Sequence, residues 1–414
     1  MTIHKHTIKK VKAPKFSFKE VAPCLFAILI DILGFGLVAP LLISFFTSPE
    51  TNIFQITSPT MSYFYLGLTL ALYPLFMFFG SSFIGDLSDI IGRKKTLILS
   101  MLGMSFGFCL MTLGIITTCL SLFLVGRGLS GLVAASQSVA LATISDLSTK
   151  SNKAIHISYI ALIQCIGLIL GPLMGGVLGE KSFYLPFLLV MILALIAFFW
   201  ILFGFKETFI KNEDKKISFT RLFTIFIDGY NNKRVRDLSF AFLTMQIGIA
   251  LYLPIILILL TTEYDYTPLY LGLFNGYVGI GFAFGLLVIL PQMLKVLKIE
   301  QIVCLSLFTS FIAQFLSSIL HTDVFIWLFA FPLAIGVEMA FTGMYTSFSN
   351  AANAKSQGWV MGISVALMAI SWAFAGITTQ LIPKFGVHTI IFIGCIFLGS
   401  SALLMKKYCS NHPI

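Results

Sequence analysis

Long apolar stretches alternate with short polar segments along the whole chain. Twelve apolar stretches stand out, and several exceed the roughly 18 residues that mark a membrane-spanning helix. The pattern predicts spanning helices at 21–46, 61–84, 96–118, 120–142, 155–178 and 184–205, and again at 238–261, 269–290, 299–319, 323–346, 358–381 and 386–406. The longest polar connection separates the sixth helix from the seventh, so we predict two groups of six.

The composition agrees with this pattern and argues against a soluble protein. Hydrophobic residues make up 58% of the 414 residues and charged residues 11%, with a mean hydropathy of +0.96. A soluble domain carries about 25% charged residues. Too few polar groups remain to cover a surface in water, so lipid must be part of the solvent. The predicted fold is an all-α membrane protein whose twelve transmembrane helices form two pseudo-symmetric six-helix bundles.

Basic residues fall almost entirely in alternate connections. Of the 27 Lys and Arg residues, 24 lie in the two tails, the central linker and the loops that share their side. The opposite side holds only Lys181 and Lys384, while Arg127 lies inside a predicted helix. By the positive-inside rule, both termini are expected to be cytoplasmic in an inner membrane. The net charge of +10 therefore needs no nucleic-acid partner.

These boundaries define the expected organisation of the chain. A cytoplasmic tail (1–20) precedes the first bundle (21–205), a linker (206–237), the second bundle (238–406) and a short cytoplasmic tail (407–414). The first apolar run is too long for a signal peptide, so we expect no cleaved leader. Residues 217–230 of the linker mix apolar and charged side chains. They are either an amphipathic helix on the membrane surface or an ordinary solvated segment.

A dense motif follows the second predicted helix. Its members are Gly85, Leu87, Asp89, Gly92, Arg93 and Lys94. A turn flanked by glycines lets two helices pack closely, and an acid and a base on it can pair only when the two halves meet on the cytoplasmic side. The alternative is a purely topological role for the basic residues. The spacing resembles the cytoplasmic signature of the major facilitator superfamily, except at Ile90, where that family usually has a basic residue.

A second motif repeats glycine every fourth residue in the fifth predicted helix. It comprises Gly167, Gly171, Pro172, Gly175 and Gly176. One helix face then lacks side chains, which favours close packing against another helix. The run is similar to the signature of antiporters in the same superfamily. Asp31 and the residues up to Pro40 resemble a segment of drug–proton antiporters such as tetracycline exporters. That resemblance implies that Asp146 forms a cytoplasmic latch with Arg93, whereas a solvated acid at a helix end is the alternative.

Three ionisable residues lie inside predicted spans. A charge at the centre of a spanning helix costs at least ~2.5–3.5 kcal/mol, so it normally faces a cavity or a partner. Asp31 and Glu338 are the candidate protonation sites, and Arg127 is the charge that tunes them. Arg127 alternatively extends toward the outer membrane surface.

Further polar and aromatic residues are candidates to line a central cavity. Thr342 and Tyr345 lie on the same helix face as Glu338. The other candidates are Gln164, Gln246, Asn275 and Trp372. Alternatively, each amide side chain makes a hydrogen bond between helices, and Trp372 is a packing residue.

The expected function is proton-coupled export of small organic molecules by alternating access. The seven cysteines lack the spacing of a metal site and predict no disulfide. We expect no cofactor and no catalytic residue, and a monomer whose partners are the cargo, protons and the bilayer. A dedicated exporter of an endogenous metabolite, such as a siderophore, would share every motif. A nutrient symporter of this fold would lack the glycine motif. A membrane enzyme or receptor would need a catalytic cluster or a sizeable soluble domain.

Overall fold

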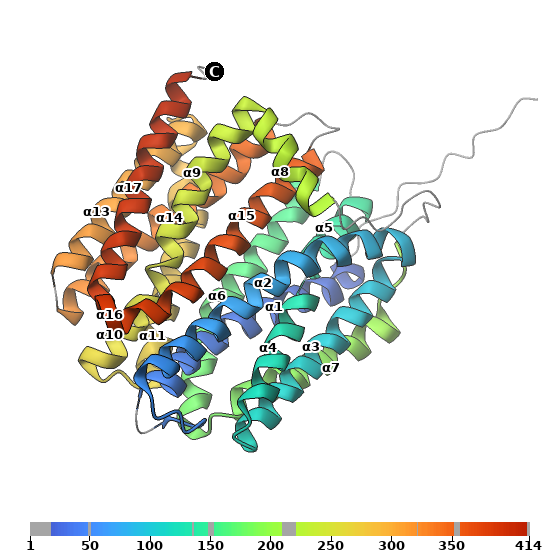
Figure 1. The fold of residues 1–414 in the computed structure, drawn as a ribbon. Helices are drawn as coiled ribbons and strands as arrows, with labels where there is room; N and C mark the ends of the chain where they lie inside the picture. The colour runs from blue at the N-terminus through green and yellow to red at the C-terminus, as the bar shows by residue number, and fades with distance from the viewer. Residues whose placement is uncertain are drawn as a thin grey trace, which may run out of the picture.

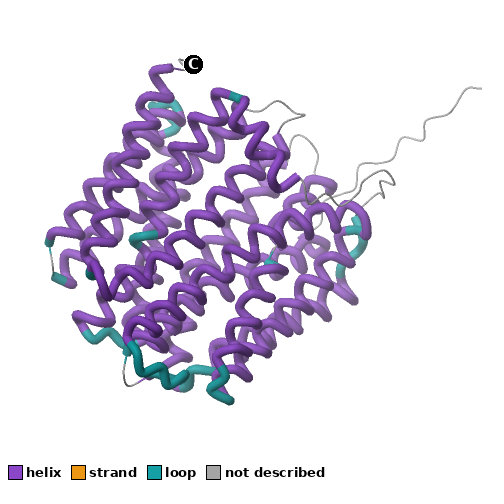
Figure 2. The backbone as a smooth tube through the Cα atoms, viewed as in Figure 1, coloured by secondary structure: helices purple, strands orange, loops and turns teal. Residues whose placement is uncertain are grey.

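The computed structural model describes residues 18–48, 51–134, 136–147, 153–208, 221–320, 322–351 and 357–411. Within these ranges every regular element is a helix (Figure 2). The first half comprises α1 (Phe18–Thr47), α2 (Pro59–Ile91), α3 (Arg93–Ile116), α4 (Leu120–Val133), α5 (Ser136–Leu147), α6 (Lys153–Lys181) and α7 (Leu185–Gly204). The linker carries α8 (Arg221–Asn231). The second half comprises α9 (Lys233–Ala250), α10 (Leu253–Tyr264), α11 (Pro268–Phe284), the π-helix η2 (Gly285–Ile289), α12 (Leu290–Met293), α13 (Ile299–Ile319), α14 (Asp323–Ala351), α15 (Gln357–Thr378), the 3₁₀-helix η3 (Thr379–Leu381), α16 (Ile382–Phe385) and α17 (Val387–Asn411).

The predicted membrane fold is confirmed. Twelve helical segments of the described chain are long and apolar enough to cross a membrane, and each overlaps one predicted stretch. Large apolar side chains also face outward: Phe203 is 81% exposed and Leu403 71%. Water would disfavour such a surface, whereas hydrocarbon solvates it. The outer faces of the helices are therefore lipid-facing.

Two predicted helices are broken, so the prediction of one continuous helix at each place is wrong. The stretch at 120–142 is divided into α4 and α5, because Ala134 leaves the helical conformation with φ −74° and ψ 71°. The stretch at 238–261 is divided at Leu251 and Tyr252, just before Pro254. It also begins earlier than predicted, at Lys233. Apolar pattern alone does not reveal where a backbone N–H finds a partner outside its own helix.

The two halves meet mainly along two helix pairs, α2 with α15 and α6 with α11, and α1 also contacts α10 and α11. Both pairs come together at the far end of the molecule, which carries the described connections at 51–58, 117–119, 182–184, 265–267 and 386. There, a Cβ at Gly376 would lie 2.9 Å from the Gly67 carbonyl oxygen, and one at Gly272 only 3.0 Å from the Gly176 Cα. In Figure 1 the helices converge toward this end and spread toward the opposite, linker end, where α8 and the end of α17 lie.

Two hydrogen bonds also join the halves at the far end. The Thr379 hydroxyl donates to the Tyr63 carbonyl oxygen at 3.2 Å. The Thr267 hydroxyl donates to the Glu180 carboxylate at 2.8 Å. Since glycine contact and hydrogen bonding coincide, the far end is the closed end of the interface between the halves.

The linker contains a helix, α8, and its predicted position on the membrane surface stays a prediction. In α8, Gly229 is buried against α15, where an added Cβ would meet the Ile363 side chain. Ile227 and Tyr230 point outward, at 62% and 64% exposure. Residues 209–220, which include the start of the predicted amphipathic segment, lie outside the described residues.

Candidate functional site

Asp31 lies near the middle of α1, and its carboxylate faces the break between α4 and α5. Its Oδ2 accepts the Ser136 backbone N–H at 3.1 Å and also the Ser136 hydroxyl. In a continuous helix that N–H would bond the carbonyl four residues earlier. Asp31 therefore supplies the acceptor that the break removes. The side chain is only 9% exposed, and its Oδ1 has no hydrogen-bond partner.

The Asp31 carboxylate lies beside the first residue of a helix. Because α5 begins at Ser136, the carboxylate lies at the positive end of that helix, which favours a negative charge. Half-helices whose N-termini point at anionic groups recur in the binding sites of transporters. Because Oδ1 has no hydrogen-bond partner, it is the oxygen of this carboxylate that can bind a proton. One oxygen holds the carboxyl in place while the other remains available.

Arg127 is 2% exposed and points into the protein rather than toward a membrane surface. Its Nε donates to the Thr69 carbonyl oxygen at 3.4 Å, and its Cζ lies 4.6 Å from the centroid of the Tyr73 ring. The Nη1 atom has no hydrogen-bond partner. No ion pair within the described ranges joins this guanidinium to Asp31 or Glu338. Its charge is balanced mainly by an aromatic face and a carbonyl dipole.

Aromatic rings extend from Arg127 to the second half of the molecule. The Tyr73 ring lies 5.5 Å from that of Phe35, which follows Asp31 by one turn of α1. Phe35 in turn meets Trp372 of α15 edge-to-face at 5.8 Å. Such aromatic pairs contribute about 0.5–1.5 kcal/mol beyond their buried area. Trp372, a predicted cavity residue, therefore lies at the contact between the halves.

Glu338 is separate from this cluster. It lies half-buried on α14, where the Thr342 hydroxyl donates to its Oε1 at 3.3 Å. Further along α14, the centroid of the Tyr345 ring lies 5.6 Å from that of the Phe242 ring of α9. Thr342 and Glu338 therefore share one face of α14, and the role of that face as a cavity wall stays a prediction.

The predicted amide candidates are distributed over three helices. Gln246 is 3% exposed on α9, while Gln164 of α6 and Asn275 of α11 are half-buried. Within the described residues, no hydrogen bond joins these three side chains to one another. Their role as cavity residues stays a prediction.

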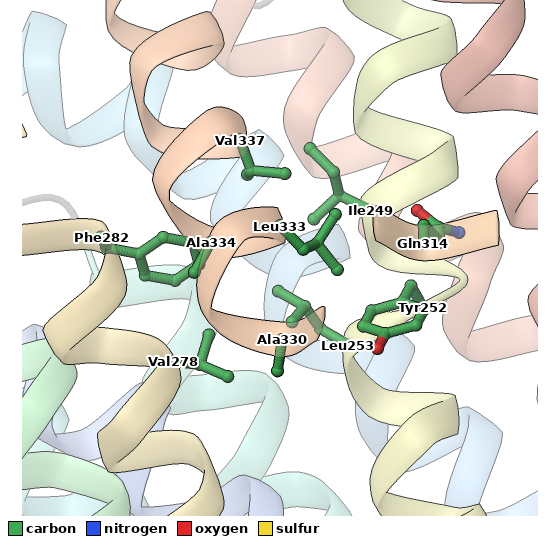
Figure 3. A pocket seen from close by; sticks show the side chains of 10 residues that line it. All are labelled: Ile249, Tyr252, Leu253, Val278, Phe282, Gln314, Ala330, Leu333, Ala334 and Val337. Atoms are coloured by element: carbon green, nitrogen blue, oxygen red, sulfur yellow. The ribbon is translucent and has the colours of Figure 1, made fainter. Parts of the chain in front are cut away.

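A small cavity of about 10 Å³ lies inside the second half, at the break between α9 and α10 (Figure 3). Its walls are apolar except for Tyr252, whose hydroxyl is 2.8 Å from that of Ser317, and Gln314. Gln314 is fully buried, and its Oε1 has no hydrogen-bond partner. A cavity needs roughly 10–15 Å³ to hold one water. The cavity beside Tyr252 is too small for a cargo and lies within the second half, so it is not the predicted central cavity.

The motif after the second span is helical almost throughout. Gly85, Leu87 and Asp89 belong to the last turns of α2, and only Gly92, with φ +99°, separates α2 from α3. The predicted loop is thus a one-residue break, which only glycine adopts without strain. Across it, Arg93 Nη1 donates to Asp89 at 2.6 Å and to the Ser88 hydroxyl at 2.5 Å. This pair lies within the first half, so the prediction that the acid and base of this turn pair only when the two halves meet is wrong.

Glu207, just after α7, caps this turn. Its carboxylate accepts the backbone N–H groups of Arg93 at 3.0 Å and Lys94 at 3.1 Å. An anion is stabilised there because these N–H groups form the positive end of α3. The predicted partner of Arg93, Asp146, lies on the described backbone of α5, but its side chain is outside what the structure describes. The latch between them stays a prediction.

The glycine motif of α6 packs against two helices. A Cβ at Gly171 would lie 3.2 Å from the Leu33 carbonyl oxygen of α1, and one at Gly175 would meet Leu37 of the same helix. The Pro172 ring and Gly167 also face α1. Gly176 instead faces α11, where a Cβ would lie 2.6 Å from the Pro268 carbonyl oxygen. The expected close packing is confirmed, and one of its two partners belongs to the opposite half.

Several residues of the site escaped sequence reasoning. Ser136 gives no signal, because serine is common in spanning helices and its importance depends on the break before it. Tyr73 was indicated only by its polar hydroxyl in an apolar stretch. Glu207 stands directly after an apolar helix in a linker of mostly basic charge, and that contrast was the available clue.

Comparison with known proteins gives a family match over most of the chain. The model described as Major Facilitator Superfamily matches residues 24–376. The chain is 31% identical over 180 residues to the class B tetracycline resistance protein of Escherichia coli, covering 44% of this chain and 42% of that protein. It is 26% identical over 352 residues to the class D protein of Salmonella ordonez, covering 82% and 83%. With multidrug resistance protein 2 of Bacillus subtilis (strain 168), identity is 23% over 383 residues, covering 91% and 92%.

The match with the class B protein thus spans less than half of that relative. Among solved structures, a human organic anion transporter superposes with a TM-score of 0.72 at 16% identity, covering 94% of this chain and 99% of that chain. A D-xylose–proton symporter superposes with a TM-score of 0.73 at 13% identity, covering 94% and 97%. At these identities the likeness establishes the fold.

Proposed function

Because the chain belongs to the major facilitator superfamily of membrane transporters, we propose that it exports small organic molecules across the inner membrane in exchange for protons. The names of its relatives, tetracycline and multidrug resistance proteins, support an exporter. The antiporter-like glycine motif of α6 supports the same direction of transport. The cargo crosses by alternating access between the two halves.

The arrangement around Asp31 is the observation that carries the proposal. An ionised carboxylate inside a spanning helix is costly unless it is paired or neutralised. The Ser136 N–H and hydroxyl stabilise the charged form through Oδ2, while Oδ1 lacks a partner. A proton on Oδ1 removes the charge without breaking the contact to α5. Loading and release of one proton then require no rebuilding of the site.

The closed far end supplies the gate that alternating access requires. Asp31 lies on α1, which packs on the glycine face of α6. The other face of α6 meets α11 through Gly176 and Gly272. We expect protonation of Asp31 to shift the balance between this closed arrangement and one in which α6 and α11 separate. The proton gradient across the membrane then drives the cycle.

The proposed orientation places the linker end in the cytoplasm and both termini with it. The strong asymmetry of Lys and Arg between the two sides supports this orientation. We further propose that the protein works as a monomer. Reporter fusions after Lys95, within the 206–237 linker and at the C-terminus should all report a cytoplasmic location. A periplasmic signal from any of them would contradict the orientation.

Transport by purified protein in proteoliposomes tests the function. With an imposed pH gradient, the wild-type protein should move tetracycline or ethidium and release protons in parallel. Asp31→Asn should lose gradient-driven transport while retaining cargo binding, because asparagine resembles the protonated acid in shape. Glu338→Gln is the matched variant of a second membrane-embedded acid and should be less impaired. Undiminished gradient-driven transport by Asp31→Asn would refute the assigned proton site.

A further inference from the structure

Two cysteines that are 105 positions apart meet at the linker end of the second half. Cys304 lies in the second turn of α13 and Cys409 near the end of α17, and their Sγ atoms are 3.6 Å apart. Both thiols are free and half-buried, so each remains within reach of small solutes. A disulfide needs about 2.05 Å between the sulfurs. The gap to be closed is about 1.5 Å, on the scale of a side-chain rotation.

The packing around the pair holds the two sulfurs together. Helices α13 and α17 are in contact, and the Cys409 thiol points at the Glu300 carbonyl oxygen, 3.9 Å away in the first turn of α13. Glu300 and Tyr408 beside it are only 8% and 6% exposed, so this part of the interface is well packed. The close approach of the thiols is therefore built into the helix pair.

We propose that Cys304 and Cys409 form a redox-active pair that a peroxide oxidises to a disulfide joining α13 and α17. In the first step, one thiolate attacks the peroxide. An S–O bond forms, the O–O bond breaks, and a sulfenic acid and hydroxide result; the hydroxide takes up the proton that the thiol had lost and becomes water. In the second step, the other thiol attacks the sulfenyl sulfur. The S–S bond forms and a second water leaves, so two thiols are oxidised while one peroxide is reduced.

The consequence of the bond follows from its place in the fold. Both cysteines belong to the second half, so the disulfide does not tie the two halves to each other. It closes a loop containing α14 to α17, which restricts the unfolded chain and stabilises that half. If the linker end is cytoplasmic, as proposed above, cellular reductants keep the pair reduced at rest. The disulfide is then a reversible response to oxidation.

Peptide mapping of the full-length protein tests the proposal. Protein in lipid bilayers is treated with hydrogen peroxide, remaining free thiols are alkylated, and the chain is digested without reductant. We expect a cross-linked peptide pair containing residues 304 and 409, lost on addition of dithiothreitol. We also expect a higher thermal unfolding midpoint for the oxidised protein than for the reduced one.

Two variants make the test specific. Cys304→Ser should abolish the cross-linked pair and the peroxide-induced rise of the unfolding midpoint. Cys109→Ser removes another half-buried cysteine, from α3 in the first half, and should change neither. The proposal is overturned if residues 304 and 409 stay fully alkylatable, or reach sulfinic acid without cross-linking, under peroxide that oxidises Cys109. None of these outcomes depends on whether the protein transports a cargo.

Discussion

The Arg127 guanidinium lies 4.6 Å from the centre of the Tyr73 ring, while the Asp31 carboxylate binds Ser136. Two opposite charges are thus buried in one cluster, each held by its own uncharged partner. The Tyr73 ring links them, because its centroid lies 5.5 Å from that of Phe35, one turn after Asp31 on α1. A direct ion pair would trap both groups in a low-dielectric interior. In the part of the chain that the structure describes, Asp31 and Arg127 form no such ion pair, and Asp31 Oδ1 has no hydrogen-bond partner.

The first prediction concerns the ring of Tyr73. A desolvated cation–π contact contributes about 2 kcal/mol, which corresponds to roughly a 30-fold change in an equilibrium or a rate. Tyr73→Leu removes the ring and should slow gradient-driven export by about that factor. Tyr73→Phe keeps the ring and should retain most of the activity. Export rates in proteoliposomes measure both, and equal loss in the two variants would assign the role to the hydroxyl instead.

The second prediction concerns the hydrogen bond from Ser136 to Asp31. Hydrogen bonds to charged groups contribute about 1.5–3 kcal/mol, so Ser136→Ala should lower the unfolding midpoint at alkaline pH, where the carboxyl is ionised. In an Asp31→Asn background the same change should have a much smaller effect. Ser130→Ala is the matched control, because this buried hydroxyl bonds only the carbonyl of Arg127 on its own helix. Equal effects of Ser136→Ala in both backgrounds would show that the two residues are uncoupled.

The third prediction compares two glycines of the same motif. Gly92 has φ +99°, and a Cβ there would fall on the Glu207 carboxylate, whereas a Cβ at Gly85 would meet nothing within 4 Å. Gly92→Ala should therefore destabilise the protein by at least ~1 kcal/mol, from backbone strain and loss of the cap on α3. Gly85→Ala should be tolerated. Thermal unfolding of the two variants provides the comparison, and a tolerated Gly92→Ala would mean that the turn readily rearranges.

The fourth prediction concerns closure of the far end. A methyl group at Gly176 would press on the Pro268 backbone, which cannot move aside as a side chain can. Gly176→Ala should oppose contact between α6 and α11 and reduce export about tenfold or more. A cysteine introduced at Asn275 of α11 should then react faster with an impermeant maleimide added from outside. Gly204→Ala serves as control, since its methyl would meet only the side chain of Trp200. Unchanged labelling with Gly176→Ala would show that this contact does not close the far end.

The sequence predicts those features that depend on a local stretch of chain. The twelve spans were predictable because hydrocarbon tolerates only long apolar segments with internally bonded backbones. The glycine spacing of α6 likewise predicted a smooth face for another helix, and Gly171 and Gly175 do contact α1. The sequence did not predict the breaks near Ala134 and Leu251, because both lie within apolar runs whose composition does not change.

The sequence by itself determined the number of spans, the division into two halves and the positions of the buried charges. Only the tertiary structure decided what those charges contact. Asp31 and Ser136 are 105 positions apart, Arg93 and Glu207 are 114 apart, and Arg127 bonds a carbonyl 58 positions away. No local pattern encodes such pairs, because helix periodicity reports which face is apolar and not which residue of another helix lies opposite. The unmet hydrogen-bonding needs of broken helix ends and buried charges selected these partners once the helices had packed.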